Sequence, residues 1–277
     1  MATEYVSCTL PKGGRKIKFA EELFPKASHI LIGGATGCGK STLIEDYIYS
    51  TITTKYPSEV SFCLVDPKRV ALVQFKNLPH TIRYVTEKAD TIKLLDDIIF
   101  TMDNRYKDMA KRGLKKYDKT RIVVIIDELG DLMTTCKKEI MPRIQRIAQL
   151  GRASGIMLIC ATQCPNRRII PAEMTVNFDG RVGMKCLNCI ESKQILNNRK
   201  GAELLPQHGK AIYLHSNGKY YEISIPLIEE AELDRVVRFL SAQKISKEQT
   251  EVKQNEQTVD KGRQKWYEVF SRRRAVR

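Results

Sequence analysis

The sequence GATGCGKS at residues 34–41 is the feature that most restricts the folds open to this chain. It fits the pattern G-x-x-x-x-G-K-[ST] and lies between an apolar run, HILIGG at 29–34, and a segment with helical spacing, STLIEDYIYSTI at 41–52. A strand, a glycine-rich loop and a helix in this order predict a phosphate-binding loop, in which backbone N–H groups and the helix dipole hold phosphate oxygens. The motif therefore predicts an α/β fold with a nucleotide site.

Two side chains of this loop have expected roles. Lys40 is expected to reach the β and γ phosphates of ATP, and the Ser41 hydroxyl is expected to ligate Mg²⁺. The residues expected to contact the nucleotide are Gly34, Ala35, Thr36, Gly37, Cys38, Gly39, Lys40, Ser41 and Thr42.

The run RIVVIIDE at 121–128 reads as a buried strand that ends in two acidic residues. Asp127 is expected to hold the magnesium ion through water, and Glu128 stands where a general base could activate the attacking water. Such a base favours hydrolysis over phosphoryl transfer to a substrate. The alternative is that the carboxylates cap the following helix, but a buried strand that ends in two acids is otherwise costly.

A third strand, GIMLICAT at 155–162, is followed by Gln163. If this strand lies between the other two motif strands, Gln163 faces the γ phosphate and can sense its presence. Alone this is a weak signal, because polar residues are common at strand ends.

Apolar strands and helical segments alternate along most of the chain, with a further strand at 61–66 and an amphipathic helix at 91–111. This pattern predicts a mostly parallel central sheet with helices on both faces. Shorter runs near 178–185, 210–215 and 219–225 predict that the sheet is extended, with antiparallel strands at its edge. The expected divisions are a lead-in at 1–28, the α/β nucleotide-binding domain at 29–243, a polar linker at 244–262 and a basic arm at 263–277, for which a frayed tail is the alternative.

The net charge of +15 predicts an anionic partner, for which nucleic acid is the commonest choice and a basic surface kept for solubility is the alternative. The segment RYKDMAKRGLKKYDKTR at 105–121 carries eight basic residues against two acids and is a candidate phosphate contact or a solvated face. Neither a signal peptide nor an apolar run long enough for a membrane helix is evident, which predicts a cytoplasmic protein.

A series of motifs in order resembles the FtsK/SpoIIIE-type DNA translocases, within the FtsK–HerA group of P-loop ring ATPases. The motifs are ATGCGKS (35–41), VDPKR (65–69), LPH (78–80), MDNRY (102–106), IIDELGDLM (125–133), RIAQLGRASGIMLICATQCPN (146–166) and GAELLP (201–206). The resemblance implies a RecA-like domain that forms a homohexameric ring, hydrolyses ATP between subunits and pumps double-stranded DNA. It also implies that Arg152 acts on the neighbour's ATP and that Arg181 lies near the subunit interface, for which a structural ion pair is the alternative.

This sequence departs from the family pattern in three places, which concern DNA-contacting details and not the ATPase core. They are residues 173–176 (EMTV), 191–193 (ESK) and 206–214 (PQHGKAIYL). The compact chain favours a plasmid, phage or conjugative element, with a relaxase or replication initiator as a possible partner. Two other functions stay open, a HerA-like or replication-associated ring helicase and an ATP-gated DNA adaptor. Glu128 argues against the adaptor, since a switch needs no positioned base.

Overall fold

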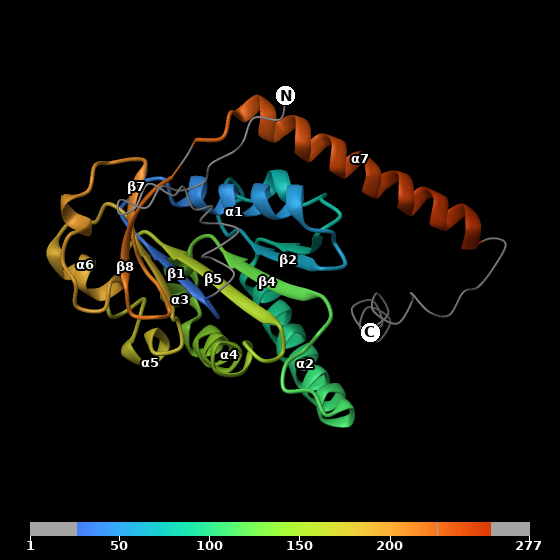
Figure 1. The fold of residues 1–277 in the computed structure, drawn as a ribbon, viewed down its shortest axis with the longest axis horizontal. Coiled ribbons are helices and arrows are strands. Elements are labelled where there is room, and N and C mark those ends of the chain that lie inside the picture. Colours follow the sequence, from blue (N-terminus) through green and yellow to red (C-terminus); the bar gives the residue numbers. More distant parts are fainter. Residues whose placement is uncertain (1–26, 226, 256–277) are drawn as a thin grey trace.

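An eight-stranded sheet organises the chain in the computed structural model, which describes residues 27–225 and 227–255 (Figure 1). The strand order is β3-β2-β4-β5-β1-β6-β7-β8. The strands are β1 (Ile30–Gly33), β2 (Val60–Val65), β3 (Thr81–Val85), β4 (Arg121–Ile126), β5 (Ile156–Thr162), β6 (Gly180–Gly183), β7 (Lys210–Leu214) and β8 (Tyr220–Ser224). The helices are α1 (Lys40–Thr54), α2 (Lys88–Arg112), α3 (Leu129–Thr135), α4 (Lys137–Leu150), α5 (Ala172–Thr175), α6 (Cys189–Ile195) and α7 (Glu230–Asn255), with short 3-10 turns η3 (Val73–Phe75) and η4 (Ala202–Leu204).

The first six strands pair in parallel, and β7 pairs antiparallel with both β6 and β8. This confirms the expected fold class, a mostly parallel α/β sheet with antiparallel strands at one edge. The central strands β1 and β5 are buried at every position, because helices cover both of their faces. Parallel pairing also brings the carboxyl ends of β1, β4 and β5 together along one edge of the sheet, the edge formed by strand ends and not by an outermost strand.

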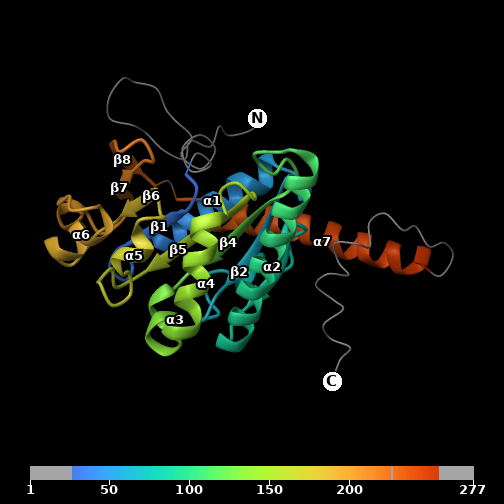
Figure 2. The same cartoon turned by 90° about the horizontal axis from the view of Figure 1, so that it is seen from below.

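Two apolar cores lie on the two faces of the sheet. One joins the sheet to α1, η3 and the beginning of α7, and the other joins it to α2, α3 and α4. Figures 1 and 2 show these helices as separate layers on either side of the strands. Alternate residues of each central strand feed opposite cores: Ile125 of β4 packs under α1, while Val124 and Ile126 pack under α2 and α4.

The structure differs from the sequence-based expectation at two elements. Strand β3 was not expected; it forms an edge of the sheet beside β2, and its three middle residues are only partly buried. The last helix was expected to end at residue 243, but α7 continues to Asn255. The added segment contains Lys, Glu and Gln without Gly or Pro, so its polar composition does not stop a helix. Residues 1–26 of the lead-in and the basic arm lie outside the described residues.

Candidate functional site: a phosphate-binding loop and its acidic strand end

The phosphate-binding loop connects β1 to α1 and depends on glycine at three positions. Gly37 and Gly39 have φ angles of 72° and 98°, in the left-handed region that favours glycine. Gly34 has no room for a side chain, because a Cβ atom there would lie 2.8 Å from the Cys38 sulfur and 2.9 Å from Met184 Cβ. The Ala35 N–H donates to the Lys185 carbonyl at 2.7 Å, which ties the loop to the segment after β6.

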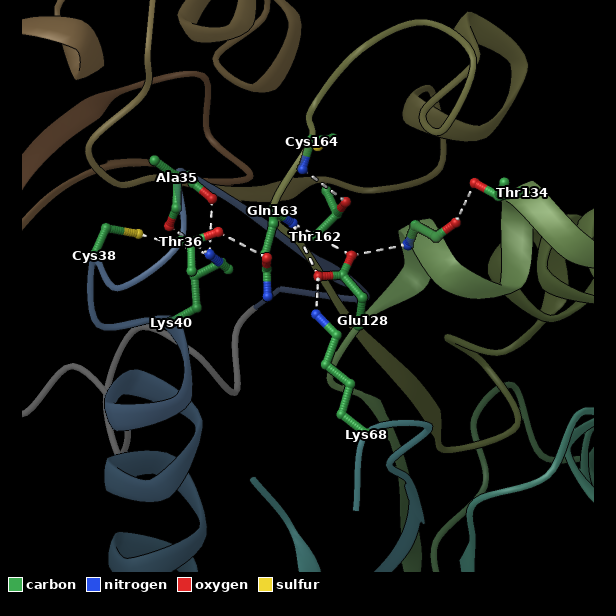
Figure 3. Close-up of polar contacts among 12 residues, drawn as sticks. Ala35, Thr36, Cys38, Lys40, Lys68, Glu128, Thr134, Thr162, Gln163 and Cys164 are labelled. Carbon is green, nitrogen blue, oxygen red and sulfur yellow. Dashed lines mark hydrogen bonds and ion pairs between the residues drawn. The ribbon is translucent and has the colours of Figure 1, made fainter. Parts of the chain in front are cut away.

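The N-terminus of α1 is open to an anion. Its N-cap is Gly39, which provides no side-chain cap, and no acidic residue lies in the first turn. The first N–H groups of a helix have no partner within the helix, so the half-buried Ser41 and Thr42 stand where phosphate oxygens can take these bonds. The buried Lys40 ammonium lies inside the loop, 2.7 Å from the carbonyl oxygens of both Gly34 and Ala35 (Figure 3). These features fit the phosphate groups of a nucleotide.

Asp127 follows β4 at the same edge of the sheet. Burial and the negative charges of Asp66 and Glu128 raise the pKa of its carboxyl to about 6. Asp66 is itself fully buried; one carboxylate oxygen accepts from the Leu72 N–H at 3.0 Å, and the other has no hydrogen-bond partner among the described residues. Three carboxylates therefore concentrate negative charge beside the loop, and a cation would relieve it.

This donor set fits Mg²⁺ bound together with a nucleotide. No group of three or more His, Cys, Asp or Glu side chains in the described ranges forms a metal cage of its own. Mg²⁺ in nucleotide sites usually has only one or two protein ligands and completes its octahedron with phosphate oxygens and water. The Ser41 hydroxyl and the Asp127 carboxylate are the groups that would hold it, directly or through water.

Glu128 is 3% exposed and is held from three sides. Its carboxylate accepts from the Gly130 N–H at 3.0 Å and from the Gln163 N–H at 3.3 Å, and it pairs with the Lys68 ammonium at 3.4 Å (Figure 3). Glu128 is therefore the N-cap of α3, as the helix-cap alternative proposed. Capping fixes the orientation of this carboxylate, so the cap and a general base are compatible roles for one residue.

Gln163 joins the loop to the acidic residues. Strand β5 lies between β4 and β1, which is the arrangement that the sequence argument required for Gln163 to face the nucleotide. The Thr36 hydroxyl donates to the Gln163 side-chain oxygen at 2.8 Å, while the Gln163 N–H points to Glu128. The structure thus brings Thr36, Lys40, Glu128 and Gln163 together in one site (Figure 3).

The two arginines are placed very differently. Arg152 is exposed in the turn before β5, at the opposite end of the strand from Gln163. Arg181 is buried on β6, where its guanidinium donates to the carbonyl oxygens of Phe178 at 3.1 Å and Thr175 at 2.6 Å. Burial lowers the pKa of Arg181. These contacts favour the structural alternative for Arg181, with carbonyl groups of its own chain in place of an ion pair.

A cleft of about 610 Å³ opens beside Glu128 and Gln163. Its walls come from α3, the loop after β5 and Lys68, and three of its lining residues are cationic: Lys68, Lys137 and Arg168. The sequence motif around Lys68 gave no reason to pair it with Glu128, 60 residues away. Lys137 and Arg168 were not singled out from the sequence either, because isolated basic residues carry no signal without their position in the fold.

The basic segment 105–121 lies elsewhere, at the end of α2 and in the loop before β4. This segment ends where β4 begins. It therefore lies at the amino ends of the parallel strands, opposite the carboxyl ends that carry the phosphate-binding loop. At least four of its eight basic residues have partners within the described part of the chain. Arg105 donates to the Ser154 carbonyl and Arg121 to the Ala27 carbonyl, Arg112 pairs with Asp108 and Asp118, and Lys119 pairs with Asp108. No helix in the described part of the chain is both long enough and apolar enough to cross a membrane.

Comparison with known proteins decides the family. The profile of the FtsK/SpoIIIE family matches residues 3–121 and 116–167, more than half of the chain. The chain belongs to the FtsK/SpoIIIE family. Two curated FtsK/SpoIIIE relatives named DNA translocase FtsK come from Tropheryma whipplei (strain TW08/27) and Chlorobaculum tepidum. The first is 33% identical over 237 residues, covering 78% of this chain and 32% of that protein. The second is 34% identical over 236 residues, covering 78% and 29%.

The chain thus spans about a third of the length of these relatives. Solved structures agree on the fold of this FtsK/SpoIIIE domain. The pCW3 conjugation coupling protein TcpA superposes with a TM-score of 0.68 at 20% identity, covering 86% of this chain and 71% of that one. The cytoplasmic domain of the Thermomonospora curvata Type VII secretion ATPase EccC gives a TM-score of 0.66 at 23% identity, covering 77% and 28%. At these identities the likeness shows the P-loop ATPase fold alone.

Proposed function

We propose that this chain is a DNA-dependent ATPase that moves double-stranded DNA, and that it works as a ring, expected to be a hexamer, with each ATP hydrolysed between two subunits. The observation that carries the proposal is the separation of two sets of residues on one chain. The phosphate-binding loop, Asp127 and Glu128 lie together at one edge of the sheet, while Arg152 lies exposed at the other.

On one subunit the residues form a hydrolytic site with separate roles. The α1 N-terminus and Lys40 bind and orient the phosphates, and Ser41 with Asp127 holds the metal ion. Mg²⁺ supplies, when bound, a positive charge that neutralises the phosphate oxygens. Glu128 orients a water molecule and accepts its proton as the water oxygen attacks the γ phosphorus and the bond to the bridging oxygen breaks.

Arg152 cannot complete the site of its own subunit. It precedes the seven residues of β5, and Gln163 follows them, so about 20 Å of strand separates the arginine from the nucleotide site. An exposed arginine at this distance serves the site only of another subunit, where it stabilises charge that develops on the γ phosphate. Hydrolysis then requires assembly.

DNA as the partner is supported by charge and by the relatives. The chain carries a net charge of +15, and in the cleft beside Glu128 the cations Lys68, Lys137 and Arg168 outnumber the acids Glu128 and Asp131. Cationic side chains bind a phosphate backbone without reading its sequence, which suits a motor that moves along any duplex. Both curated relatives are named DNA translocases. The source in a mobile element, the relaxase or initiator partner and the cytoplasmic location stay predictions of the sequence.

The test is displacement of a third strand from a duplex DNA that carries a triplex, in the presence of ATP and Mg²⁺. A translocase displaces the third strand and leaves the two duplex strands paired. Separation of a forked duplex without displacement from the triplex would support the ring helicase instead. ATP-dependent DNA binding without either activity would support the adaptor. Glu128→Gln is the control, since this variant should bind DNA without displacing the third strand.

A further inference from the structure

We propose that Arg105 is a positioning residue for Arg152: it fixes the turn that presents this arginine and so acts on the nucleotide site of the neighbouring subunit. The inference rests on the proposed function, in which Arg152 is supplied to that neighbour. Arg105 belongs to the MDNRY motif, to which neither the nucleotide site nor the cleft gives a role.

The turn in question, residues 151–155, connects α4 to β5 and has little freedom. Gly155 has a φ angle of 72°. A Cβ atom on Gly151 would lie 2.6 Å from the Ile147 carbonyl oxygen, so the chain passes close to α4 there. Between these glycines the Arg152 side chain is exposed, with no hydrogen bond or ion pair to any other described residue.

Hydrogen bonds from α2 and the loop after it hold this turn on both sides of Arg152. The Arg105 guanidinium donates to the carbonyl oxygens of Ser154 at 2.8 Å and Gly155 at 3.4 Å. The Tyr106 hydroxyl donates to the Leu150 carbonyl at 2.7 Å, and the Tyr117 N–H donates to the Ala153 carbonyl at 2.8 Å. The contacts before and after Arg152 leave its backbone one position relative to α2.

The environment of Arg105 indicates that this contact is specific. Arg105 is 4% exposed, and its guanidinium lies 4.2 Å from the centre of the Tyr117 ring. Its Nε and Nη2 atoms have no hydrogen-bond partner among the described residues, so its hydrogen bonds there go to the Arg152 turn alone. Burial without a carboxylate partner is unfavourable for an arginine and lowers its pKa to about 10. A methionine would fill a similar space without the free-energy cost of burying a charge. The two carbonyl contacts therefore explain why an arginine fits here.

The functional consequence follows from geometry. An arginine that stabilises charge on a neighbour's γ phosphate must be held in place, and a displacement of about 1 Å can reduce turnover by about 100-fold. Loss of Arg105 would release the carbonyls of the turn and spread the positions of the Arg152 guanidinium. The nucleotide site of the same subunit would be unaffected, because it lies at the other edge of the sheet.

The experiment measures ATP hydrolysis on duplex DNA by pairs of variants mixed in equal amounts. Arg105→Met should lower kcat by about tenfold to 100-fold and leave the ATP affinity within about twofold. When Arg105→Met is mixed with Glu128→Gln, one interface in about four combines an intact base with an intact arginine turn, and activity should return. When Arg105→Met is mixed with Arg152→Ala, no interface has an intact arginine, and activity should stay low.

Three controls separate the possible failures. Arg143→Met removes an arginine of α4 that donates to Asp96 of α2 and lies away from the turn; this variant should keep full turnover. Tyr106→Phe removes only the hydroxyl hydrogen bond to Leu150 and should give a milder loss of activity. Glu128→Gln should rescue it and Arg152→Ala should not, so this variant tests the proposal if Arg105→Met does not fold. Arg152→Ala mixed with Glu128→Gln tests the arginine in trans by itself.

The outcomes are distinct. Rescue of Arg105→Met by Glu128→Gln and not by Arg152→Ala supports the proposal. Rescue by Arg152→Ala would place Arg105 in the site of its own subunit and overturn the proposal. Full activity of Arg105→Met would also overturn it, and if Arg105→Met does not fold, full activity of Tyr106→Phe would overturn it. If Arg152→Ala and Glu128→Gln fail to rescue each other, the arginine in trans and the proposal fall together.

Discussion

The Thr36 hydroxyl of the phosphate-binding loop donates a 2.8 Å hydrogen bond to the side-chain oxygen of Gln163. The backbone N–H of the same glutamine lies 3.3 Å from each carboxylate oxygen of Glu128. Gln163 therefore contacts the loop that holds phosphates with its side chain and the general base with its backbone (Figure 3). The cleft lies next to both Gln163 and Glu128, so a change at the phosphates has a short route to it.

The bond between Thr36 and Gln163 should be needed for coupling to DNA and not for nucleotide binding. Gln163→Leu removes the acceptor and Thr36→Val removes the donor, and each should reduce stimulation by DNA while ATP binding stays within about twofold. Because both remove one bond, the double variant should be no worse than the single ones, with a coupling energy of about 1 kcal/mol. Additive losses in this double-mutant cycle would show that the two residues act separately.

Glu128 should show two separable roles. Glu128→Gln removes the base but keeps an oxygen that can cap α3, so turnover should fall by at least about 100-fold with little change in stability. Glu128→Ala removes the cap as well and should lose about 1 kcal/mol of unfolding free energy in addition. Steady-state hydrolysis and thermal unfolding distinguish the two variants. Equal unfolding temperatures for both would contradict the capping role seen at Gly130.

Asp127 should make the nucleotide-free protein less stable as pH rises. Its pKa of about 6 is higher than in an unfolded chain, where it lies near 4, so the folded protein binds this proton more tightly. The stabilisation from that proton is complete below about pH 4 and is lost as pH rises through about 6. Asp127→Asn should therefore raise the Tm at pH 7.5 by about 3 °C and change little at pH 4, while abolishing Mg²⁺-dependent hydrolysis. A lower Tm at pH 7.5 would contradict the account.

Two glycines in left-handed conformations provide a matched comparison. Gly39 precedes α1 with a φ angle of 98°, and a Cβ atom there would lie 3.3 Å from Met184 Cε. Gly113 ends α2 with a φ angle of 66° and open space around it. Alanine at either position should cost about 1 to 2 kcal/mol of stability from the backbone strain. Only Gly39→Ala should also weaken ATP binding, which nucleotide titration of both variants measures; equal affinities would contradict the position of the loop.

Much of the fold could be predicted because its central strands are continuous apolar runs that end in motif residues. The run that forms β4 can be predicted because Val123, Val124 and Ile125 are consecutive apolar residues, and all three are buried in the structure. Strand β3 was missed because it is short, lies at the edge of the sheet and includes a charged residue, Arg83. The last residues of α7 are polar, and low hydrophobicity predicts a linker there; the segment is helical because helix formers fill it.

The site could be predicted only where residues are adjacent in sequence to a strand end. Lys40, Asp127 and Gln163 follow strands that meet at one edge of the sheet, so their proximity follows from the parallel topology. Lys68 and Arg105 could not be assigned partners in this way. Their contacts with Glu128 and with the Arg152 turn are between segments 60 and 49 residues apart, and the contacts depend on packing that no local pattern records.

The measurement that tests the central claim most directly is the rate of ATP hydrolysis with and without linear duplex DNA, with Glu128→Gln as the blank. The account predicts that duplex DNA raises the rate at least about tenfold, that the stimulation weakens as salt screens the phosphates, and that Glu128→Gln abolishes it. A rate that duplex DNA leaves unchanged would contradict the claim that this site drives DNA movement.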